Sequence, residues 1–398
     1  MSRWLISGSW LLRPFNLIRL CALLLVGCLL VLGSKYLRKV YAYTQFQQTQ
    51  YASYQFHTLK NPTGIAYSPT LNFPANHDYL IIADTGNNVI RSFDRVGGKL
   101  TTIAGNGTAG YVDGALASAE FDHPTGIEVI SHYVYGTNPY RWDDIFVSDS
   151  NNYVVRIFCL GNPYSVQDKN PKCPYNYGMD VGTYAGNHSK GLVNTTLLSS
   201  EFAHLSGVHT AIGYAIDADN HTIRGISGTG ATTYAGTGTA GFVNGYRTSA
   251  QFNTPTKLTS GPGGLFISDA GNHVIRKIDA SGNVTTFSGS GTSGYADGSP
   301  ASARFVWPTS VAWNSSDSYF YVTDPVNNSI RRIDQSGNVT TYSGAPTSGL
   351  VNGTLSQARY SNPTDLVIVG GFMYVTDTNN NCVRRIDMNA GIVSTYIN

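Results

Sequence analysis

Charged residues are scarce in this chain, and acidic residues are absent from its first part. Asp, Glu, Lys and Arg account for 13% of the 398 residues, and no acidic residue precedes Asp78. Six of the 26 Lys and Arg residues lie within the first 39 positions, which leaves 20 basic against 24 acidic residues in the remainder. A nucleic-acid-binding protein normally presents a basic face. The shortage of basic residues therefore excludes nucleic acid as an expected partner.

Methionine and cysteine are also rare, with 4 and 5 residues, whereas the chain contains 43 Gly and 26 Tyr. This composition is typical of short strands joined by turns and argues against a helical protein. The chain has no phosphate-binding loop, no C-x-x-C motif and no Ser-His-Asp order. Asp217 and Asp219 resemble the start of a calcium loop, but no EF-hand pattern follows. We therefore expect no cofactor, no bound metal and no catalytic residues.

One long apolar run lies near the N-terminus. Residues 20–33 read LCALLLVGCLLVLG, and together with residues 15–18 the run is long enough to cross a membrane. We expect a short basic segment at 1–14, a transmembrane signal-anchor at 15–34, a juxtamembrane linker at 35–56 and a globular domain at 57–398 on the extracytoplasmic side. Two alternatives stay open: a cleaved signal peptide of a secreted protein, and a targeting region followed by a span in the mitochondrial inner membrane.

An eight-residue phrase occurs six times in the rest of the chain. In every copy Asn follows Asp by three positions and Arg follows it by seven. The copies are DTGNNVIR (84–91), DSNNYVVR (149–156), DADNHTIR (217–224), DAGNHVIR (269–276), DPVNNSIR (324–331) and DTNNNCVR (377–384). Repeats at this spacing are typical of a solenoid, a propeller or an array. The phrase therefore marks a unit of structure, because a single active site would not be copied in this way.

Each unit contains four short β-rich runs separated by Gly, Asn and Asp turns. The first run follows a start such as NPTGIAY (61–67), the second ends at the phrase Asp, the third carries the Arg, and the fourth resembles LTTIAG (100–105). Four such runs are typical of a four-stranded antiparallel blade. We therefore predict an all-β fold: a six-bladed β-propeller of four-stranded antiparallel blades, preceded by the apolar transmembrane segment.

The D-x-x-N-x-x-[IV]-R core, its Pro-Thr start and its closing Gly turn resemble the NHL repeat of six-bladed β-propellers. The resemblance covers about residues 57 to 398. It implies the fold, and because this fold hosts scaffolds, receptors and some enzymes, it leaves the function open. We expect a membrane-anchored scaffold or complex subunit that binds a protein or a ligand rather than an enzyme. The alternative is a channel-mouth hydrolase or lyase similar to strictosidine-synthase-like or amidating-lyase propellers.

The repeated Asp and Arg are expected to have a structural role. The Arg shares one face of its strand with apolar residues, so it should be buried between blades, where a guanidinium needs a carboxylate partner. The Asp of the same copy supplies that partner, and the Asn suits a turn position with positive φ. The structural set is Asp84, Arg91, Asp149, Arg156, Asp217, Arg224, Asp269, Arg276, Asp324, Arg331, Asp377 and Arg384.

Four residues are candidates for a site at the mouth of the central channel. His123 and His204 occupy equivalent starting positions of two units, but a zinc site needs a third protein ligand, and the other units supply none. Amidating lyases of this fold use three His, so their zinc chemistry is not expected here. Lys257 and Asp365 stand where other units have Gly or Ser, and we expect them to form an ion pair.

The second unit carries insertions at residues 131–144 and 159–180, and the first unit carries one at 68–79. In an antiparallel blade these connections leave at the end opposite the D-x-x-N turns, so the insertions gather on one face. Tyr, Trp and Arg dominate protein interfaces, and we predict that these residue types bind a protein partner there. The alternative is that they only pack the insertions together. The set is Tyr133, Tyr135, Tyr140, Arg141, Trp142, Tyr164, Tyr175 and Tyr177.

Two covalent modifications are also predicted. Cys159 and Cys173 bracket an insertion, and a disulfide between them would close a loop of about 15 residues. Sequons such as Asn106-Gly-Thr and Asn187-His-Ser are compatible with glycosylation on a secretory route. Both modifications fit an extracytoplasmic domain.

Overall fold

The computed structural model describes residues 58–69, 77–134, 140–161, 180–209, 211, 213–228 and 230–398. The predicted segments 1–14, 15–34 and 35–56 lie outside these residues. Among the residues that the structure describes, no helix has the length and apolar character needed to cross a membrane.

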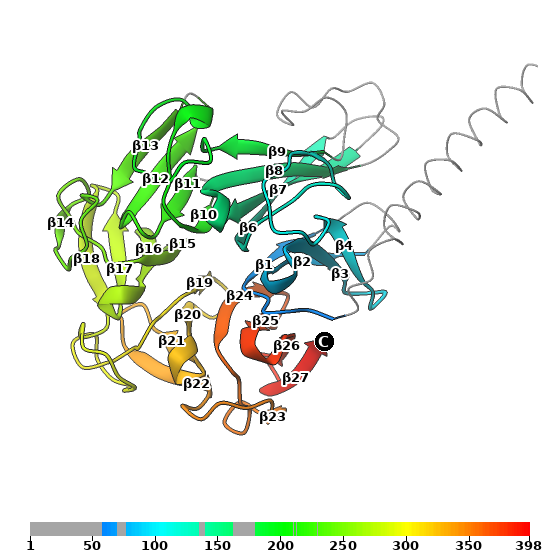
Figure 1. Cartoon of the computed structure of the whole chain (residues 1–398). Helices are drawn as coiled ribbons and strands as arrows, with labels where there is room; N and C mark the ends of the chain where they lie inside the picture. The colour runs from blue at the N-terminus through cyan, green and yellow to red at the C-terminus, as the bar shows by residue number, and fades with distance from the viewer. Residues whose placement is uncertain are drawn as a thin grey trace, which may run out of the picture. The chain divides into compact units, whose positions relative to one another are not determined.

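Six antiparallel sheets follow one another along the chain and form the blades of a ring, which Figure 1 shows in chain order from blue to red. Within each sheet the strands are hydrogen-bonded in sequence order, apart from short extra strands at some outer edges. The prediction of an all-β, six-bladed propeller with four-stranded antiparallel blades is confirmed.

The strands occupy equivalent places in the six blades. The innermost strands begin within or just after the Pro-Thr starts. They are β1 (Gly64–Ser68), β6 (Pro124–Val134), β10 (Leu205–His209), β15 (Pro255–Gly261), β19 (Val311–Asn314) and β24 (Pro363–Val369). The second strands, which end at the phrase Asp, are β2 (Tyr79–Asp84), β7 (Tyr140–Asp149), β11 (Tyr214–Asp217), β16 (Gly264–Asp269), β20 (Tyr319–Asp324) and β25 (Phe372–Asp377).

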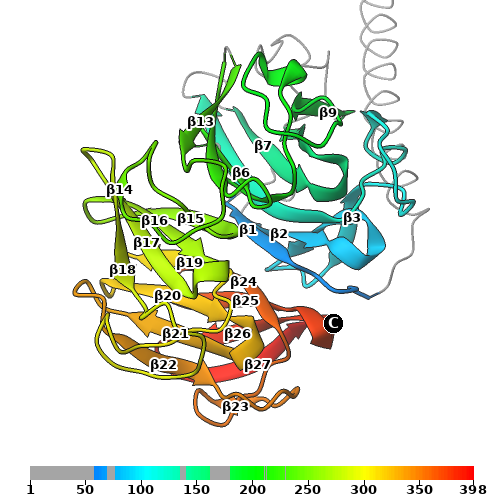
Figure 2. The same ribbon diagram turned by 60° about the vertical axis from the view of Figure 1, so that its left-hand side comes forward.

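The remaining strands complete each blade toward the outside. The third strands, which carry the phrase Arg, are β3 (Val89–Asp94), β8 (Val154–Gly161), β12 (Thr222–Ser227), β17 (Val274–Asp279), β21 (Ser329–Ile333) and β26 (Cys382–Asp387). The fourth strands are β4 (Leu100–Ala104), β9 (Asp180–Ala185), β13 (Gly230–Ala235), β18 (Asn283–Ser288), β22 (Val339–Gly344) and β27 (Ile392–Ile397). Short strands β5 (Gly114–Ala115), β14 (Gly245–Tyr246) and β23 (Gly353–Thr354) extend blades 2, 4 and 6. In Figure 2, β15, β19 and β24 lie toward the middle of the ring and β18, β22 and β27 toward its outside.

The ring has two distinct ends. We call the end that carries the D-x-x-N turns the turn end, and the opposite end the insertion end. Because β6 and β7 are antiparallel, as are β8 and β9, the end of β6 and the start of β7 lie at the insertion end, and so do the end of β8 and the start of β9. The end of β1 and the start of β2 lie at the same end.

Apolar side chains fill the spaces between neighbouring blades. One cluster joins Phe146 and Val155 of blade 2 to Leu205 of blade 3, and equivalent clusters lie at the next three interfaces. A further cluster joins Ile82 of blade 1 to Val383 of blade 6. Because a blade buries its apolar faces against its neighbours, the ring is stabilised as a whole and not blade by blade.

Within the described part of the chain, the ring closes without a strand shared between its first and last blades. Asn61 N donates to Asn381 Oδ1 at 2.8 Å, and Thr364 Oγ1 donates to the carbonyl oxygen of Thr63 at 3.1 Å. Bonds of the same two kinds join other neighbouring blades, as described below. The closure therefore uses contacts that repeat around the ring.

Candidate functional site

The repeated Asp and Arg lie next to each other inside the blades. In blade 4, Arg276 Nη1 donates to Asp269 Oδ2 at 2.9 Å, and both side chains are fully buried. Arg276 also donates to the carbonyl oxygens of Gln251 and Val243, and its Nη2 donates to Asn244 Oδ1 at 2.8 Å. These three acceptors belong to the connection that leads into blade 4. The Arg therefore ties the turn of its own blade to the connection that precedes it.

The same bonds occur in blades 2, 3, 5 and 6. The Arg–Asp distances there are 2.8, 2.9, 3.2 and 2.9 Å. In blade 1, Arg91 Nη1 lies 3.8 Å from Asp84 Oδ2. Burial raises the pKa of Asp269 and lowers the pKa of Arg276, so it disfavours both charges. The hydrogen bonds offset that cost, and each member of the pair depends on the other. The side-chain acceptors in the connections are Asp113, Asn194, Asp297 and Asn352.

The motif Asn has a different role from the one predicted. Asn272 Nδ2 donates to Asp269 Oδ2 and to the carbonyl oxygen of Gly241, both at 2.8 Å. The left-handed residue is the next one, His273, with φ of 58°. The prediction of a positive φ at the Asn itself is wrong, because its amide must reach the Asp carboxylate. The left-handed residues of the six turns are Asn88, Tyr153, His221, His273, Asn328 and Asn381.

Several of these residues with left-handed backbone conformation contact the start of the next blade through their side chains. Asn88 Oδ1 accepts from His123 N at 3.1 Å, and His221 Nδ1 accepts from Thr254 N at the same distance. The bond between Asn381 and Asn61 that helps to close the ring belongs to this series.

The hydroxyl residues of the Pro-Thr starts, to which sequence reasoning assigned no role, join the inner strands in a cycle. Thr309 Oγ1 donates to the carbonyl oxygen of Thr364 at 2.7 Å, and Thr364 Oγ1 donates to that of Thr63 at 3.1 Å. Equivalent bonds link the other neighbouring blades, with Ser206 in the place of Thr in blade 3. The signal was present in the sequence, since every unit has Thr or Ser at this position.

The position after this hydroxyl residue divides the ring into two halves. In blades 1–3 it is Gly64, Gly126 and Gly207. A Cβ on Gly64 would lie 2.0 Å from the carbonyl oxygen of Thr125, so the neighbouring backbone leaves no space for a side chain. In blades 4–6 the position is occupied by Lys257, Ser310 and Asp365. We call these two groups the tight half and the open half of the inner layer.

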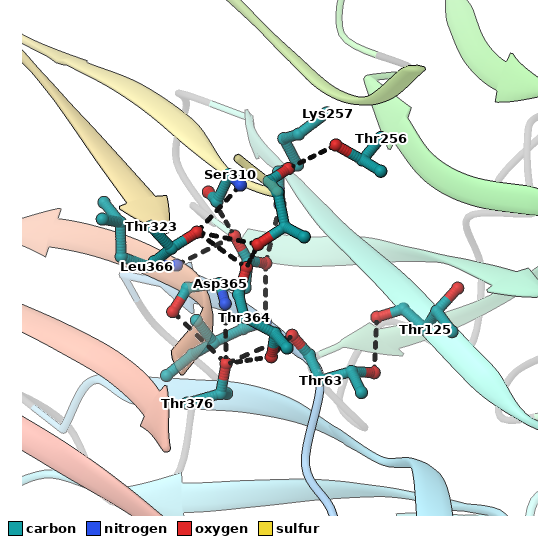
Figure 3. A network of polar contacts seen from close by, with 12 residues as sticks. Thr63, Thr125, Thr256, Lys257, Ser310, Thr323, Thr364, Asp365, Leu366 and Thr376 are labelled. Atoms are coloured by element: carbon teal, nitrogen blue, oxygen red, sulfur yellow. Dashed lines mark hydrogen bonds and ion pairs between the residues drawn. The ribbon is translucent and has the colours of Figure 1, made fainter. Parts of the chain in front are cut away.

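Asp365 is the centre of the open half, as Figure 3 shows. Its Oδ2 accepts from Lys257 Nζ at 2.7 Å and from Ile65 N at 3.1 Å. Its Oδ1 accepts from Ser310 Oγ at 2.7 Å and from Leu366 N at 2.9 Å. The buried carboxylate therefore links blades 4, 5, 6 and 1. With four donors on its two oxygens, it is suited to hold the ring together and is poorly suited to accept a proton from a substrate.

His123 and His204 lie at the turn end, at the starts of blades 2 and 3. Burial lowers the pKa of His204, and Asp219, whose Oδ1 lies 3.9 Å from His204 Nδ1, opposes this shift. Lys190 Nζ donates to the other oxygen of Asp219 at 3.1 Å. In the part of the chain that the structure describes, no three His, Cys, Asp or Glu side chains are grouped so that they could hold a metal ion.

The predicted partner-binding residues are described only in part. Tyr135, Tyr164, Tyr175 and Tyr177 lie outside the described residues. Tyr133 belongs to β6, and Tyr140 and Arg141 belong to β7. Trp142 stacks on His132 with ring centroids 4.6 Å apart, and His132 Nε2 lies 2.9 Å from Asp144 Oδ2. The hairpin of β6 and β7 is paired from Pro124 to Val134, whose partner is Tyr140.

The two predicted modifications stay predictions. Cys159 is buried in β8, and Cys173 lies outside the described residues. Cys382 is a buried free thiol in β26. Asn106 of the first sequon donates through Nδ2 to Glu120 Oε1 at 3.1 Å.

Comparisons with known proteins identify relatives of this repeat architecture, although no protein-family model matches the chain. The chain is 30% identical over 369 residues to NHL repeat-containing protein 2 of Gallus gallus. This match covers 84% of the chain and 48% of that relative. It is 26% identical over 370 residues to the chloroplastic protein SUPPRESSOR OF QUENCHING 1 of Arabidopsis thaliana, over 83% of the chain and 32% of that relative. The chain therefore spans about half the length, or less, of these relatives.

A solved structure shows the same fold at low sequence identity. An auxiliary nutrient binding protein from Bacteroides thetaiotaomicron has a TM-score of 0.54 and 14% identity, over 85% of this chain and 70% of that one. At this identity the likeness concerns the fold and not the ligand.

Proposed function

The chain belongs to the NHL-repeat six-bladed β-propellers, and we propose that it is a binding scaffold that holds a protein partner at the insertion end of its ring. We propose further that the apolar segment at residues 15–34 tethers this scaffold to a membrane, with the propeller on the extracytoplasmic side. These proposals concern this chain alone, because the relatives are much longer.

The observation that carries the proposal is the length of the β6–β7 hairpin. β6 has 11 residues, whereas the other innermost strands have between 4 and 7. β7 has 10 residues, whereas the other second strands have between 4 and 6. Extra pairs such as His132 with Trp142 and Val134 with Tyr140 extend blade 2 beyond its neighbours at the insertion end. Among the described strands no other pair is as long, so this hairpin gives a partner a distinguished place to bind, and Tyr, Trp and Arg are concentrated in its sequence.

The inner layer favours binding over catalysis. The Lys257–Asp365 pair, which was a candidate for a channel-mouth site, uses both carboxylate oxygens for bonds between blades. A general base needs an oxygen that can approach the proton it removes. The polar residues that break the repeat at the channel therefore bind neighbouring blades to one another.

The proposal is tested by shortening the hairpin without disturbing the ring. His132 and Trp142 form a cross-strand pair, so residues 133–141 can be replaced by an Asn-Gly turn that joins them. The matched control places the same turn between the paired residues Asn314 and Tyr319 of blade 5. We expect thermal melts of both variants to resemble the wild type and only the blade 2 variant to lose the protein that co-purifies from native membranes. Equal recovery of that protein with both variants would contradict the proposal.

A further inference from the structure

Two arginines share one pair of tyrosine rings where blade 6 meets blade 1. Tyr374 of β25 and Tyr396 of β27 lie with their ring centroids 5.2 Å apart. Cζ of Arg385, on β26, lies 4.9 Å from the centroid of Tyr396. Cζ of Arg95, in the turn between β3 and β4 at the insertion end, lies 5.1 Å from the centroid of Tyr374, and its Nε donates to the Tyr374 hydroxyl at 3.0 Å. These contacts join the four side chains into one cluster, which we call the seam cluster.

The two arginines of the seam cluster differ in their partners. Arg95 Nη1 donates to Asp78 Oδ2 at 2.5 Å. Arg385 lies over the rings of Phe372 and Tyr396, and in the part of the chain that the structure describes it has no hydrogen-bond or ion-pair partner. Its side chain is partly exposed, and none of its nitrogens is buried without a partner. The donors of Arg385 therefore face solvent and are available to a ligand.

The fold does not require an arginine at this position. Arg384, one residue earlier, is the phrase Arg of blade 6 and donates to four acceptors inside the ring. The residue that follows the phrase Arg is Ser92, Ile157 or Gly225 in blades 1–3, and those blades have the same four strands. A cation that the repeat does not need, held on aromatic rings with its donors unused, indicates a binding role.

We propose that the seam cluster binds a carboxylate side chain of a protein partner, so that the insertion end accepts an acidic segment. A guanidinium offers its N–H groups in a planar fork that matches a carboxylate, and stacking on the rings of Phe372 and Tyr396 holds that plane in place. The inference rests on the function proposed above, for which it names the chemistry of the partner.

The charge of the seam cluster favours a carboxylate over a phosphate group. The two arginines and Asp78 together leave one positive charge, which a single carboxylate neutralises. A phosphate group carries up to about two negative charges, so it would exceed the charge available and lie close to the Asp78 carboxylate.

The experiment measures the binding of short peptides to the full chain by fluorescence anisotropy at low ionic strength. The peptides repeat Glu-Gly, Gln-Gly or phosphoserine-Gly and carry an uncharged fluorophore. The test variant is Arg385→Met, which keeps an apolar stem over the rings. The control is Arg332→Met, at the equivalent position of blade 5, where Cζ lies 4.4 Å from the centroid of Tyr319. We expect the Glu peptide to bind best, about tenfold more weakly to Arg385→Met, and equally to the control and the wild type.

A second variant is expected to increase the affinity. Asp78→Asn removes the carboxylate that occupies Arg95, so the Glu peptide should bind more tightly, and the phosphoserine peptide should gain more than the Glu peptide. A gain in affinity cannot result from a loss of folded protein. If Arg385→Met melts at a lower temperature than the wild type, the result for Asp78→Asn decides the matter.

Four outcomes would overturn the proposal. The Glu peptide could fail to bind at concentrations up to about 1 mM, the wild type could prefer the phosphoserine peptide, Arg385→Met and Arg332→Met could weaken binding equally, or Asp78→Asn could leave it unchanged. The peptide measurements do not involve the β6–β7 hairpin. A negative result would therefore reject the seam cluster as a carboxylate site and leave the hairpin proposal to its own experiment.

Discussion

The turn end and the inner layer of this ring follow the sequence repeat to different degrees. At the turn end every blade carries the buried Asp and Arg, and the motif Asn donates to the Asp in each. In the inner layer, blades 1–3 have Gly where blades 4–6 have Lys257, Ser310 and Asp365. A buried charge needs a partner of opposite charge in every blade where it occurs. The space beside a channel can instead be filled by a neighbouring backbone or by side chains.

The two halves of the inner layer therefore hold their blades together by different means. In the tight half the backbone of the following blade occupies the space where a side chain at Gly64 or Gly126 would lie. In the open half the carboxylate of Asp365 bridges blades through hydrogen bonds and an ion pair. The cycle of Thr and Ser hydroxyls passes through both halves. The following predictions distinguish the turn end from the inner layer and then one half from the other.

The largest effect is expected at the turn end, from Arg276→Ala. The substitution leaves Asp269 buried without its cation and removes every bond from the guanidinium to the preceding connection. We expect the free energy of unfolding to fall by about 3–5 kcal/mol, measured by chemical denaturation. Lys277→Ala, at the next position on β17 but partly exposed, is the control and should cost less than about 1 kcal/mol. Similar losses for the two variants would refute the claim that the buried pair stabilises the ring.

The contrast also shows what the sequence could reveal. The blade and the Asp–Arg pairs were predictable, because both residues lie on neighbouring strands joined by a short turn, so that their spacing is local. The acceptors in the connections could not be predicted. Asn244 and Arg276 are 32 residues apart, and no sequence pattern in either segment identifies the other as its partner. The prediction placed the residue with positive φ one position too early in the turn. Asn is suited both to a hydrogen bond with the Asp carboxylate and to a positive φ, so its presence does not distinguish the two roles.

A second substitution tests the tight half. Gly64→Ala would place a methyl group against the carbonyl oxygen of Thr125, a backbone atom of the next blade that cannot rotate away. We expect a loss of about 3 kcal/mol in the free energy of unfolding, because the inner strands of blades 1 and 2 must move apart. Gly228→Ala is the control, since no atom lies within 4 Å of its Cβ position. A melting temperature unchanged by Gly64→Ala would show that the tight half is not held by backbone contact.

The open half is tested by a double-mutant cycle of Lys257→Met and Asp365→Asn. Each single change removes the ion pair, and the double change removes the same pair. The loss of unfolding free energy in the double variant, compared with the sum of the two single losses, therefore gives the energy of the pair. We expect a coupling of about 1–2 kcal/mol, below the cost at the turn end, because the Lys257 side chain is 21% exposed and retains contact with water. The coupling should persist in high salt, since the Asp365 side chain is only 7% exposed and little screened. Singles that add without coupling would mean that Asp365 joins the blades through Ser310 and the backbone of Ile65 alone, and that Lys257 is available at the channel for another task.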